Sequence, residues 1–375
     1  MLRKSMLWLA LSGLAGATGA SQPTVSVLDA VPTGHVPVAA VAGGRVVRSG
    51  EAGMAYQWPG AYFEAAFEGD GIVFAHGEGD VILHVLVDGQ RIDTLHRPLG
   101  AYRIAGLSPG RHVVRVEVAT ESQAGANRFD GFSLPAAMEA LPIPVRARRI
   151  EFIGDSHTVG YANLSTHREC DDAEVWRTTD NTRAFGALVA RHYGADYRVH
   201  AISGRGVVRN YDGGAGDTLP EAYPHALLGR SATTDDTGWQ PQVVVMALGT
   251  NDFSTPLREG ERWGGRAALQ DDYVQTYVSF VRSLHARYPD ARFVLWATDG
   301  AEGEIRAQVS RVVERLREAG GMQVDFVPVD GLVMDACHWH PSAADDSLIA
   351  ERLIRHLDGM ADSPWPEQAT STAMP

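Results

Sequence analysis

Apolar and polar positions follow different patterns in the two parts of the chain. In residues 61–67 and 114–118 they alternate with a period of two, which is typical of a strand with one buried face. Asp88 and Gly89 separate two further runs of this kind, and an Asp-Gly pair at such a position favours a tight hairpin turn. We therefore predict a β-sandwich, of the jelly-roll kind, over residues 21–135.

After residue 149, apolar strands alternate with amphipathic helical segments. The predicted strands are 150–153, 197–202, 243–248, 293–297 and 324–329, and the predicted helices are 182–193, 272–288, 304–319 and 343–356. This alternation predicts an α/β domain over residues 150–360, with three α/β/α layers and a flavodoxin-like, doubly wound parallel sheet. A proline-containing linker, 136–149, precedes it, and a small polar tail, 361–375, is predicted to be disordered.

Residues with catalytic potential follow the predicted strands. In a doubly wound sheet the active site lies beyond the carboxyl ends of the strands. A serine in a tight turn there can act as a nucleophile, and its N–H can stabilise an oxyanion. A glycine lets backbone approach a ligand, an asparagine amide can donate to an oxyanion, and a histidine can take the serine proton. The four candidates, in chain order, are Ser156, Gly204, Asn251 and His340.

Each candidate also has a simpler interpretation. Taken singly, the serine fits a helix N-cap, the glycine an ordinary turn and the asparagine another helix cap. His340 could lie in a surface loop, or it could bind a metal ion together with Asp335 and His338. The joint occurrence of the four residue types at four predicted strand ends is hard to ascribe to chance, and it favours one shared site over these separate explanations.

The segments around the serine and the histidine resemble a known superfamily. Residues 153–161 read Ile-Gly-Asp-Ser-His-Thr-Val-Gly-Tyr, and residues 337–341 read Cys-His-Trp-His-Pro. These segments, with the glycine and the asparagine between them, resemble the SGNH (GDSL-like) hydrolases. Because a β-sandwich precedes them, the chain is most similar to carbohydrate esterase family 2, whose members deacetylate plant-wall polysaccharides.

The resemblance implies a role for each candidate. Ser156 would be the nucleophile and His340 its general base. The N–H groups of Ser156 and Gly204, with the side-chain amide of Asn251, would form the oxyanion hole. Asp335 is the candidate third member of a triad, although it lies five residues before the histidine and not the usual two or three. Some family members are similar to a Ser-His dyad, in which a backbone carbonyl orients the imidazole.

Two cysteines and several aromatic residues accompany these segments. Spacing alone leaves open whether Cys170 and Cys337 form a disulfide or are two separate buried thiols, and the resemblance implies the disulfide. His157 is expected either to line the pocket or to be structural. Four aromatic residues could stack on a sugar ring, and core packing is the alternative role for each of them. These residues are Tyr161, Trp176, Trp263 and Trp339. The leading candidate for stacking is Trp339, because it adjoins His340.

Charge and composition exclude some classes of binding partner and of catalytic chemistry. The formal net charge is −13, which argues against binding nucleic acid and fits a soluble protein that acts on a neutral substrate. Lys4 is the only lysine, so the chain beyond the first 20 residues can form no Schiff base, P-loop or Ser-Lys dyad. No cofactor and no metal is expected.

The first 20 residues have the layout of a secretory signal peptide. Arg3 and Lys4 precede an apolar stretch, which small residues follow up to Ala20. An uncleaved anchor is the alternative, although the apolar stretch is shorter than the ~20 residues of a membrane span. We expect export to the periplasm or medium, and no membrane association after cleavage.

These observations lead to one expected function and two alternatives. We expect a serine esterase that removes O-acetyl groups from polysaccharides such as xylan or glucomannan through an acetyl-enzyme intermediate. The first alternative is another SGNH activity, namely that of a lipase, a thioesterase or a peptidoglycan O-acetyl esterase. The second is a non-catalytic glycan-binding protein.

Overall fold

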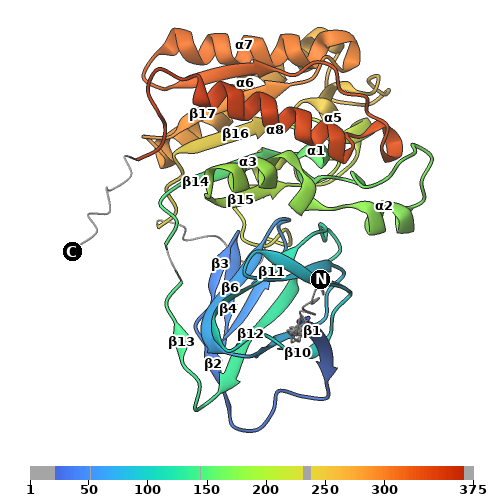
Figure 1. The fold of residues 1–375 in the computed structure, drawn as a ribbon. Helices are drawn as coiled ribbons and strands as arrows, with labels where there is room; N and C mark the ends of the chain where they lie inside the picture. The colour runs from blue at the N-terminus through green and yellow to red at the C-terminus, as the bar shows by residue number, and fades with distance from the viewer. Residues whose placement is uncertain (1–21, 51, 144, 231–237, 367–375) are drawn as a thin grey trace, which may run out of the picture.

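The computed structural model describes residues 22–50, 52–143, 145–230 and 238–366. It shows two domains in contact, with the N-terminal β-domain below the α/β domain in the view of Figure 1. The predicted signal peptide lies outside the described residues. None of the helices in the described part of the chain has both the length and the apolar composition that a membrane span requires.

The N-terminal domain is the predicted β-sandwich of two antiparallel sheets. One sheet has the order β1-β10-β7-β12-β5-β4, with β2 also paired to β12, and the other has the order β13-β6-β11-β8-β9, with β3 paired to β6. The strands are β1 (Thr24–Leu28), β2 (His35–Val38), β3 (Val41–Gly43), β4 (Val46–Ser49), β5 (Gly53–Tyr56), β6 (Tyr62–Gly69), β7 (Ile72–His76), β8 (Ile82–Val87), β9 (Gln90–His96), β10 (Gly100–Ala105), β11 (Gly110–Val118), β12 (Asn127–Pro135) and β13 (Ala140–Leu141).

Aromatic side chains from both sheets fill the core between them. Phe63 of β6 stacks on Phe129 of β12, with ring centroids 4.1 Å apart and planes at 7°. The predicted hairpin is present between β8 and β9. Asp88 and Gly89 form its turn with φ of 52° and 79°, as a two-residue turn with left-handed central residues requires.

The second domain contains the predicted parallel sheet. Its strands are β14 (Arg149–Gly154), β15 (Asp196–Ala201), β16 (Val243–Ala247), β17 (Arg292–Ala297) and β18 (Val324–Pro328). The order β15-β14-β16-β17-β18 is the 2-1-3-4-5 order of flavodoxin-like sheets. The chain therefore reverses its winding direction between β14 and β16, which is where such sheets bind ligands.

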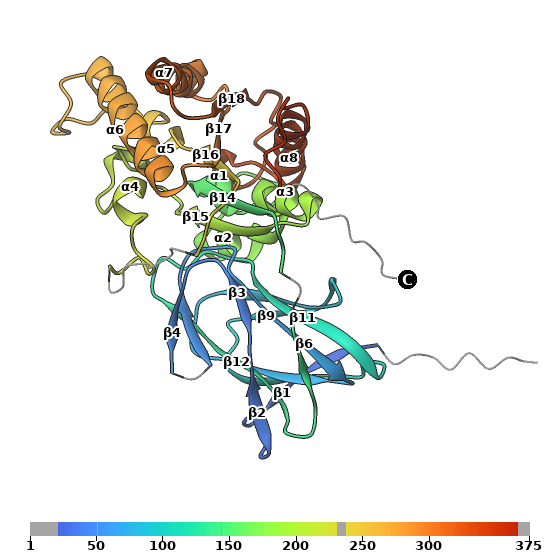
Figure 2. The ribbon, with the colours of Figure 1, turned by 90° about the vertical axis from the view of Figure 1, so that its left-hand side faces the viewer.

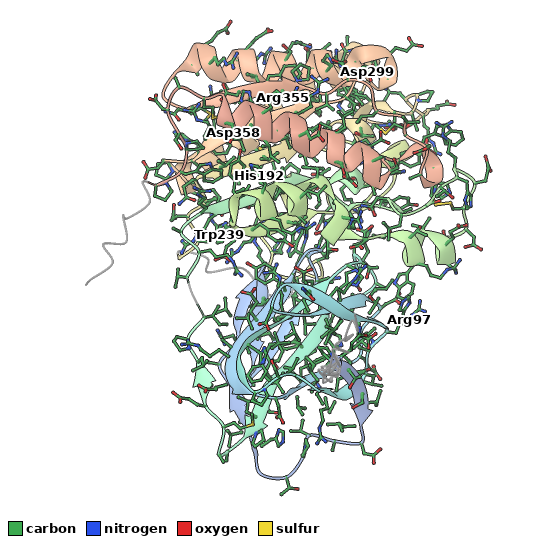
Figure 3. The ribbon with its side chains drawn as sticks, in the orientation of Figure 1. Arg97, His192, Trp239, Asp299, Arg355 and Asp358 are labelled. Carbon is green, nitrogen blue, oxygen red and sulfur yellow. A yellow bond between two sulfur atoms is a disulfide. The ribbon has the colours of Figure 1, made fainter. Side chains whose placement is uncertain are left out.

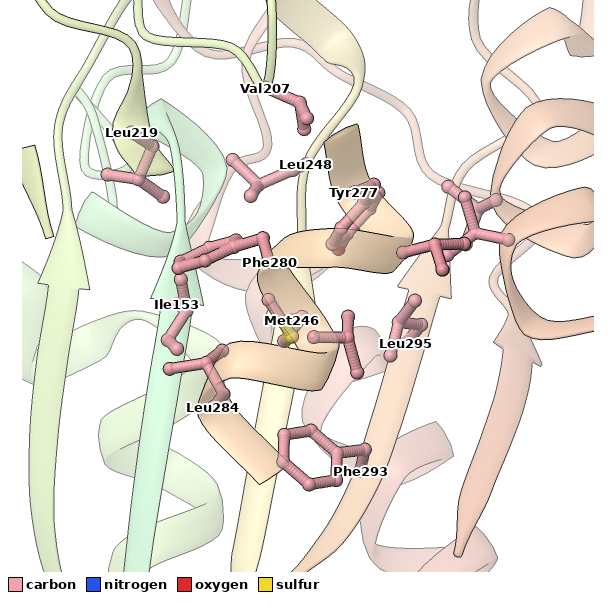
Figure 4. Packing of buried hydrophobic residues seen from close by; sticks show 14 of the residues in the cluster. Ile153, Val207, Leu219, Met246, Leu248, Tyr277, Phe280, Leu284, Phe293 and Leu295 are labelled. Carbon is pink, nitrogen blue, oxygen red and sulfur yellow. The ribbon is translucent and has the colours of Figure 1, made fainter. Parts of the chain in front are cut away.

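Helices cover both faces of this sheet (Figure 2). On one face, α6 and α7 pack on Ile153, Met246 and Leu295 (Figure 4). On the other, α3 and α8 pack on Phe152 and Val245. Helix α7 has the predicted bounds, whereas α6 begins six residues before its predicted start. The helices are α1 (Ser156–Val159), α2 (Asp172–Thr178), α3 (Phe185–Tyr193), α4 (Leu219–Ala222), α5 (Thr250–Phe253), α6 (Arg266–Arg287), α7 (Glu304–Ala319) and α8 (Ala343–Asp358).

Two segments that we predicted to be irregular are partly ordered. The linker, 136–149, contains β13, which pairs with β6, and its Arg146 forms an ion pair with Glu64 at 2.7 Å. The predicted tail, 361–375, begins with a packed segment, because Trp365 lies against Tyr193 with ring centroids 4.6 Å apart. Residues 367–375 lie outside the described part. Proline content and polarity did not indicate the order in these two segments, because the contacts that produce it are made by single side chains and one short strand.

A buried polar cluster joins the two domains. Glu151 of β14 is fully buried and accepts hydrogen bonds from Tyr223 Oη at 2.5 Å and from Trp239 Nε1 at 3.1 Å (Figure 3 labels Trp239 near the domain boundary). Arg45, from the sandwich, donates to the carbonyl oxygen of Tyr223. Burial raises the pKa of Glu151, but His200 and Arg45 together lower it to about 2. The carboxylate is therefore ionised, and a cation from the other domain balances it.

Candidate active site

The nucleophile turn follows β14 directly. Asp155 caps α1 by accepting a hydrogen bond from the backbone N–H of His157 at 3.1 Å, and Ser156 is the first residue of the helix. Gly154 has no room for a side chain, since a Cβ there would lie 1.9 Å from Thr158 Oγ1. The sequence therefore fixes this turn through contacts among five consecutive residues, and Ser156 lies at the carboxyl end of the sheet.

His340 meets this serine from a loop that lies far along the chain. Its Nε2 is 2.9 Å from Ser156 Oγ. Its Nδ1 lies 3.0 Å from the carbonyl oxygen of Cys337 and 3.2 Å from that of His338. Because a carbonyl can only accept, the proton of the neutral ring belongs on Nδ1, which leaves Nε2 free to accept the serine proton.

The geometry does not give Asp335 the role of an orienting acid. The Nδ1 that a carboxylate would face is hydrogen-bonded to backbone carbonyl oxygens, and Asp335 itself is exposed. The pair therefore has the arrangement of a Ser-His dyad. The groups that lie at Nδ1 belong to the same turn as the histidine and occupy the place where an orienting carboxylate would lie.

Contacts from elsewhere hold the histidine loop in an unusual conformation. His338 and Trp339 have φ of 55° and 59°, in the left-handed region that non-glycine residues seldom occupy. Cys337 forms a disulfide with Cys170. The backbone N–H of His338 donates to the carbonyl oxygen of Arg168 at 2.8 Å, and its Nδ1 lies 3.0 Å from Tyr161 Oη. The segment around residues 161–170 thus clamps the loop that carries the base.

Two aromatic side chains enclose the ring of His340. The ring of Tyr161 lies over that of His340 with centroids 4.3 Å apart, and His157 meets it edge-on at 5.6 Å. Burial lowers the pKa of His340 to about 4. Burial and the neighbouring His340 lower the pKa of His157 to about 3. Both rings are therefore neutral near pH 7, and both predicted pocket residues contact the base.

The predicted oxyanion donors lie on the turns beside the serine. Gly204 follows β15 with φ of 81°, a conformation that favours glycine. Asn251, at the start of α5, is 4% exposed. Its Nδ2 donates to the carbonyl oxygen of Arg205 at 2.8 Å and lies 3.3 Å from Asp155 Oδ2. The amide therefore bridges the nucleophile turn and the glycine turn.

Sequence reasoning missed two buried acids that support these turns. Asp252 accepts hydrogen bonds from the backbone N–H groups of Val207, Val208 and Arg209 at 2.9–3.0 Å, which fixes the segment after Gly204. Burial raises the pKa of Asp252 to about 6, and burial together with the charge of Asp252 raises that of Asp155 to about 7. Asp155 precedes Ser156 and Asp252 follows Asn251 in the sequence. This adjacency was the only sign in the sequence that the two acids belong to the site.

The tryptophans predicted to contact sugars have different surroundings. Trp339 is 59% exposed beside the base, and the guanidinium of Arg168 lies 5.8 Å from its ring. Trp263 is partly buried against the core, and its indole N–H donates to Asp272 at 2.9 Å. The guanidinium of Arg97, which Figure 3 labels on the sandwich, lies 4.0 Å from the ring of Trp176. Trp339 is thus the neighbour of His340 in the chain, whereas the contacts of Trp263 and Trp176 described here are with Asp272 and Arg97.

Comparisons with known proteins agree with the two-domain organisation. Residues 42–144 match the family described as carbohydrate esterase 2 N-terminal, and residues 152–354 match the GDSL-like lipase/acylhydrolase family. The first match ends before residue 145 and the second begins after residue 151, on either side of the boundary between the sandwich and the parallel sheet.

Individual relatives cover most of the chain. An acetylxylan esterase / glucomannan deacetylase of Cellvibrio japonicus is 44% identical over 321 residues, which are 84% of this chain and 89% of that protein. A solved carbohydrate esterase has a TM-score of 0.82 at 40% identity, covering 87% of this chain and 99% of that one. A family two carbohydrate esterase from Clostridium thermocellum, solved with cellohexaose, has a TM-score of 0.75 at 27% identity, covering 85% and 98%. The chain therefore belongs to carbohydrate esterase family 2.

Proposed function

We propose that this protein is a serine esterase that removes O-acetyl groups from polysaccharides. The contact of 2.9 Å between Ser156 Oγ and His340 Nε2, at the point where the sheet reverses its winding, carries this proposal. The relative from Cellvibrio japonicus, an acetylxylan esterase / glucomannan deacetylase, supports xylan or glucomannan as the substrate class.

The first step is acylation of the serine. His340 Nε2 takes the proton of Ser156 as the Oγ attacks the acetyl carbonyl carbon. The Nδ1–H of the resulting imidazolium remains hydrogen-bonded to the carbonyl oxygens of Cys337 and His338, whose dipoles favour the charged ring. His340 then protonates the departing sugar oxygen as the ester bond breaks, and water cleaves the acetyl-enzyme by the same two proton transfers.

The oxyanion of each tetrahedral intermediate is stabilised by N–H donors, and we assign this role to the N–H groups of Ser156 and Gly204 and to Nδ2 of Asn251. Both protons of the Asn251 amide are donated to Arg205 and Asp155 in this structure, so this third donor serves the oxyanion by giving up its longer bond, to Asp155. Loss of one such donor costs on the order of 3 kcal/mol of transition-state stabilisation, which is roughly a hundredfold in rate. The exposed ring of Trp339, next to the base, is the surface that we assign to stacking against a sugar.

We also propose that the protein is exported and acts outside the cytoplasm. The layout of the first 20 residues supports export, and a signal peptide would be removed there. The disulfide between Cys170 and Cys337 supports an oxidising compartment. Periplasmic and secreted fractions probed with an antibody against the full chain test this assignment.

The test of the activity is acetate release from acetylated xylan, acetylated glucomannan and O-acetylated peptidoglycan. We expect release from the first two by the wild type and a loss of about 10⁴-fold or more in Ser156→Ala. Ser347→Ala, on the exposed face of α8, is the matched control and should behave as the wild type. A p-nitrophenyl ester panel that favours acyl chains longer than about four carbons, or a wild type that binds glycan without releasing acetate, would refute the proposal.

A further inference from the structure

A loop of the N-terminal sandwich reaches the glycine turn of the active site. The loop lies between β11 and β12 and includes Glu121 and Gln123. Glu121 Oε2 accepts a hydrogen bond from the backbone N–H of Ser203 at 3.1 Å. Gln123 Nε2 donates to the carbonyl oxygen of Ser203 at 3.2 Å and lies 3.3 Å from Glu121 Oε2. Both backbone polar groups of the residue before Gly204 are thus held by the other domain.

The position of these bonds matters because a peptide unit is planar. The carbonyl of Ser203 and the N–H of Gly204 belong to the same trans peptide and point in opposite directions. A hydrogen bond that fixes the oxygen therefore also fixes the direction of that N–H. Gly204 occupies φ of 81° in a turn that the backbone N–H of Arg205 closes by donating to the carbonyl oxygen of Ile202 at 3.3 Å. The central peptide of such a turn can face either way when a glycine is in place, so a contact at the Ser203 carbonyl selects one direction for this donor.

The loop is itself anchored on both sides. Gln57 Nε2 donates to the carbonyl oxygen of Ser122 at 3.1 Å, and Gln57 Oε1 accepts from the backbone N–H of Leu228 in the hydrolase domain at 2.9 Å. The hydroxyl of Ser122 donates to the carbonyl oxygen of Gly125 at 3.0 Å. Burial raises the pKa of Glu121, and its contact with the Ser203 turn opposes this rise. The side chains that meet Ser203 therefore extend from a fixed support.

We propose that Gln123 and Glu121 are positioning residues for the oxyanion hole, holding the peptide between Ser203 and Gly204 so that its N–H points at the reacting carbonyl. The proposal rests on the function proposed above, in which that N–H stabilises the oxyanion. It makes the N-terminal domain part of the catalytic apparatus, because the restraint on one oxyanion donor comes from a side chain that only this domain supplies.

The main test is Gln123→Glu, which keeps the shape of the side chain but removes the donor to Ser203. We expect kcat on p-nitrophenyl acetate to fall about tenfold, since a misdirected donor loses part of the hundredfold that a full donor gives. We expect KM to change less than about twofold and the thermal midpoint to stay within about 2 °C. Gln90→Glu, exposed on β9, adds the same charge to the same domain and is the matched control.

A second readout isolates the oxyanion hole. A boronic acid forms a tetrahedral adduct with a catalytic serine, and one oxygen of this adduct occupies the oxyanion position. Its affinity should fall in Gln123→Glu by about the same factor as kcat. Glu121→Gln keeps an oxygen that can accept from Ser203 and should retain most activity, whereas Glu121→Ala should lose about as much as Gln123→Glu.

The outcomes separate this proposal from the proposed function. An active wild type with an inactive Ser156→Ala, and with Gln123→Glu and Glu121→Ala equal to the wild type, overturns the positioning role alone. A fall in kcat together with a large rise in KM or a lower thermal midpoint also overturns it, because such a result indicates a general structural role. A wild type without esterase activity, yet correctly folded, overturns the proposed function itself.

Discussion

The serine turn and the histidine loop are held in place in different ways, one by neighbouring residues and the other by residues far away in the sequence. Ser156 is placed by its immediate neighbours, through the cap from Asp155 and the close packing at Gly154. His340 is placed by partners far away in the sequence, including a disulfide to Cys170. The comparison shows that a local arrangement can be recognised in a short motif, whereas a loop held from a distance depends on the fold being complete.

Removal of the disulfide tests the remote support and should have the largest effect. We expect Cys170→Ser/Cys337→Ser to lower the free energy of unfolding by about 2–5 kcal/mol. We also expect kcat to fall roughly tenfold or more, because the base shifts relative to the serine. Thermal denaturation and p-nitrophenyl acetate kinetics measure both. A reductant should reproduce the result in the wild type, which has only these two cysteines. An unchanged kcat in the double variant would show that the other contacts suffice.

Gly154→Ala tests the local support of the serine. The added methyl group would lie 1.9 Å from Thr158 Oγ1 and 2.9 Å from the carbonyl oxygen of Ala247. We expect a cost of about 1–3 kcal/mol in the free energy of unfolding and a lower kcat, because the turn must shift. Gly264→Ala, where a Cβ meets nothing within 4 Å, is the matched control. Equal stability of the two variants would contradict the tight packing of this turn.

The pH dependence of kcat/KM tests whether the surroundings of His340 lower the pKa of its ring. Only neutral His340 can accept the serine proton, and burial lowers its pKa to about 4. Activity should therefore persist as the pH falls below 6.5 and should be lost near pH 4. Tyr161→Ala, which exposes the ring, should move this limb to higher pH. A wild-type midpoint at or above pH 6.5 would contradict the enclosure of the base.

The smallest effect is expected for Asp335→Asn. Because the carbonyl oxygens of Cys337 and His338 hold Nδ1 of His340, we expect kcat within about twofold of the wild type. In serine proteases, replacing the orienting acid costs about 10⁴-fold. A loss above roughly a hundredfold would restore Asp335 as a third member of the catalytic group.

Much of the hydrolase domain could be predicted because its signals are local. The bounds of α7 follow from its amphipathic periodicity, and the positions of Ser156 and Asn251 follow from their place after apolar strands. The contribution of Gln123 could not be predicted, because nothing in a turn of the sandwich indicates which distant turn its side chain meets. The same holds for β13, whose two residues carry no periodicity.

The junction at Glu151 has a practical consequence for anyone who wishes to redesign this chain. A fragment that began after residue 149 would keep the buried carboxylate and its contacts with His200, Tyr223 and Trp239, but it would lose the charge of Arg45, which helps to keep the carboxylate ionised. Because a buried charge needs compensation, this loss would lower the stability of the fragment. The hydrolase domain should therefore not be placed alone in a fusion enzyme, and a fusion should include both domains.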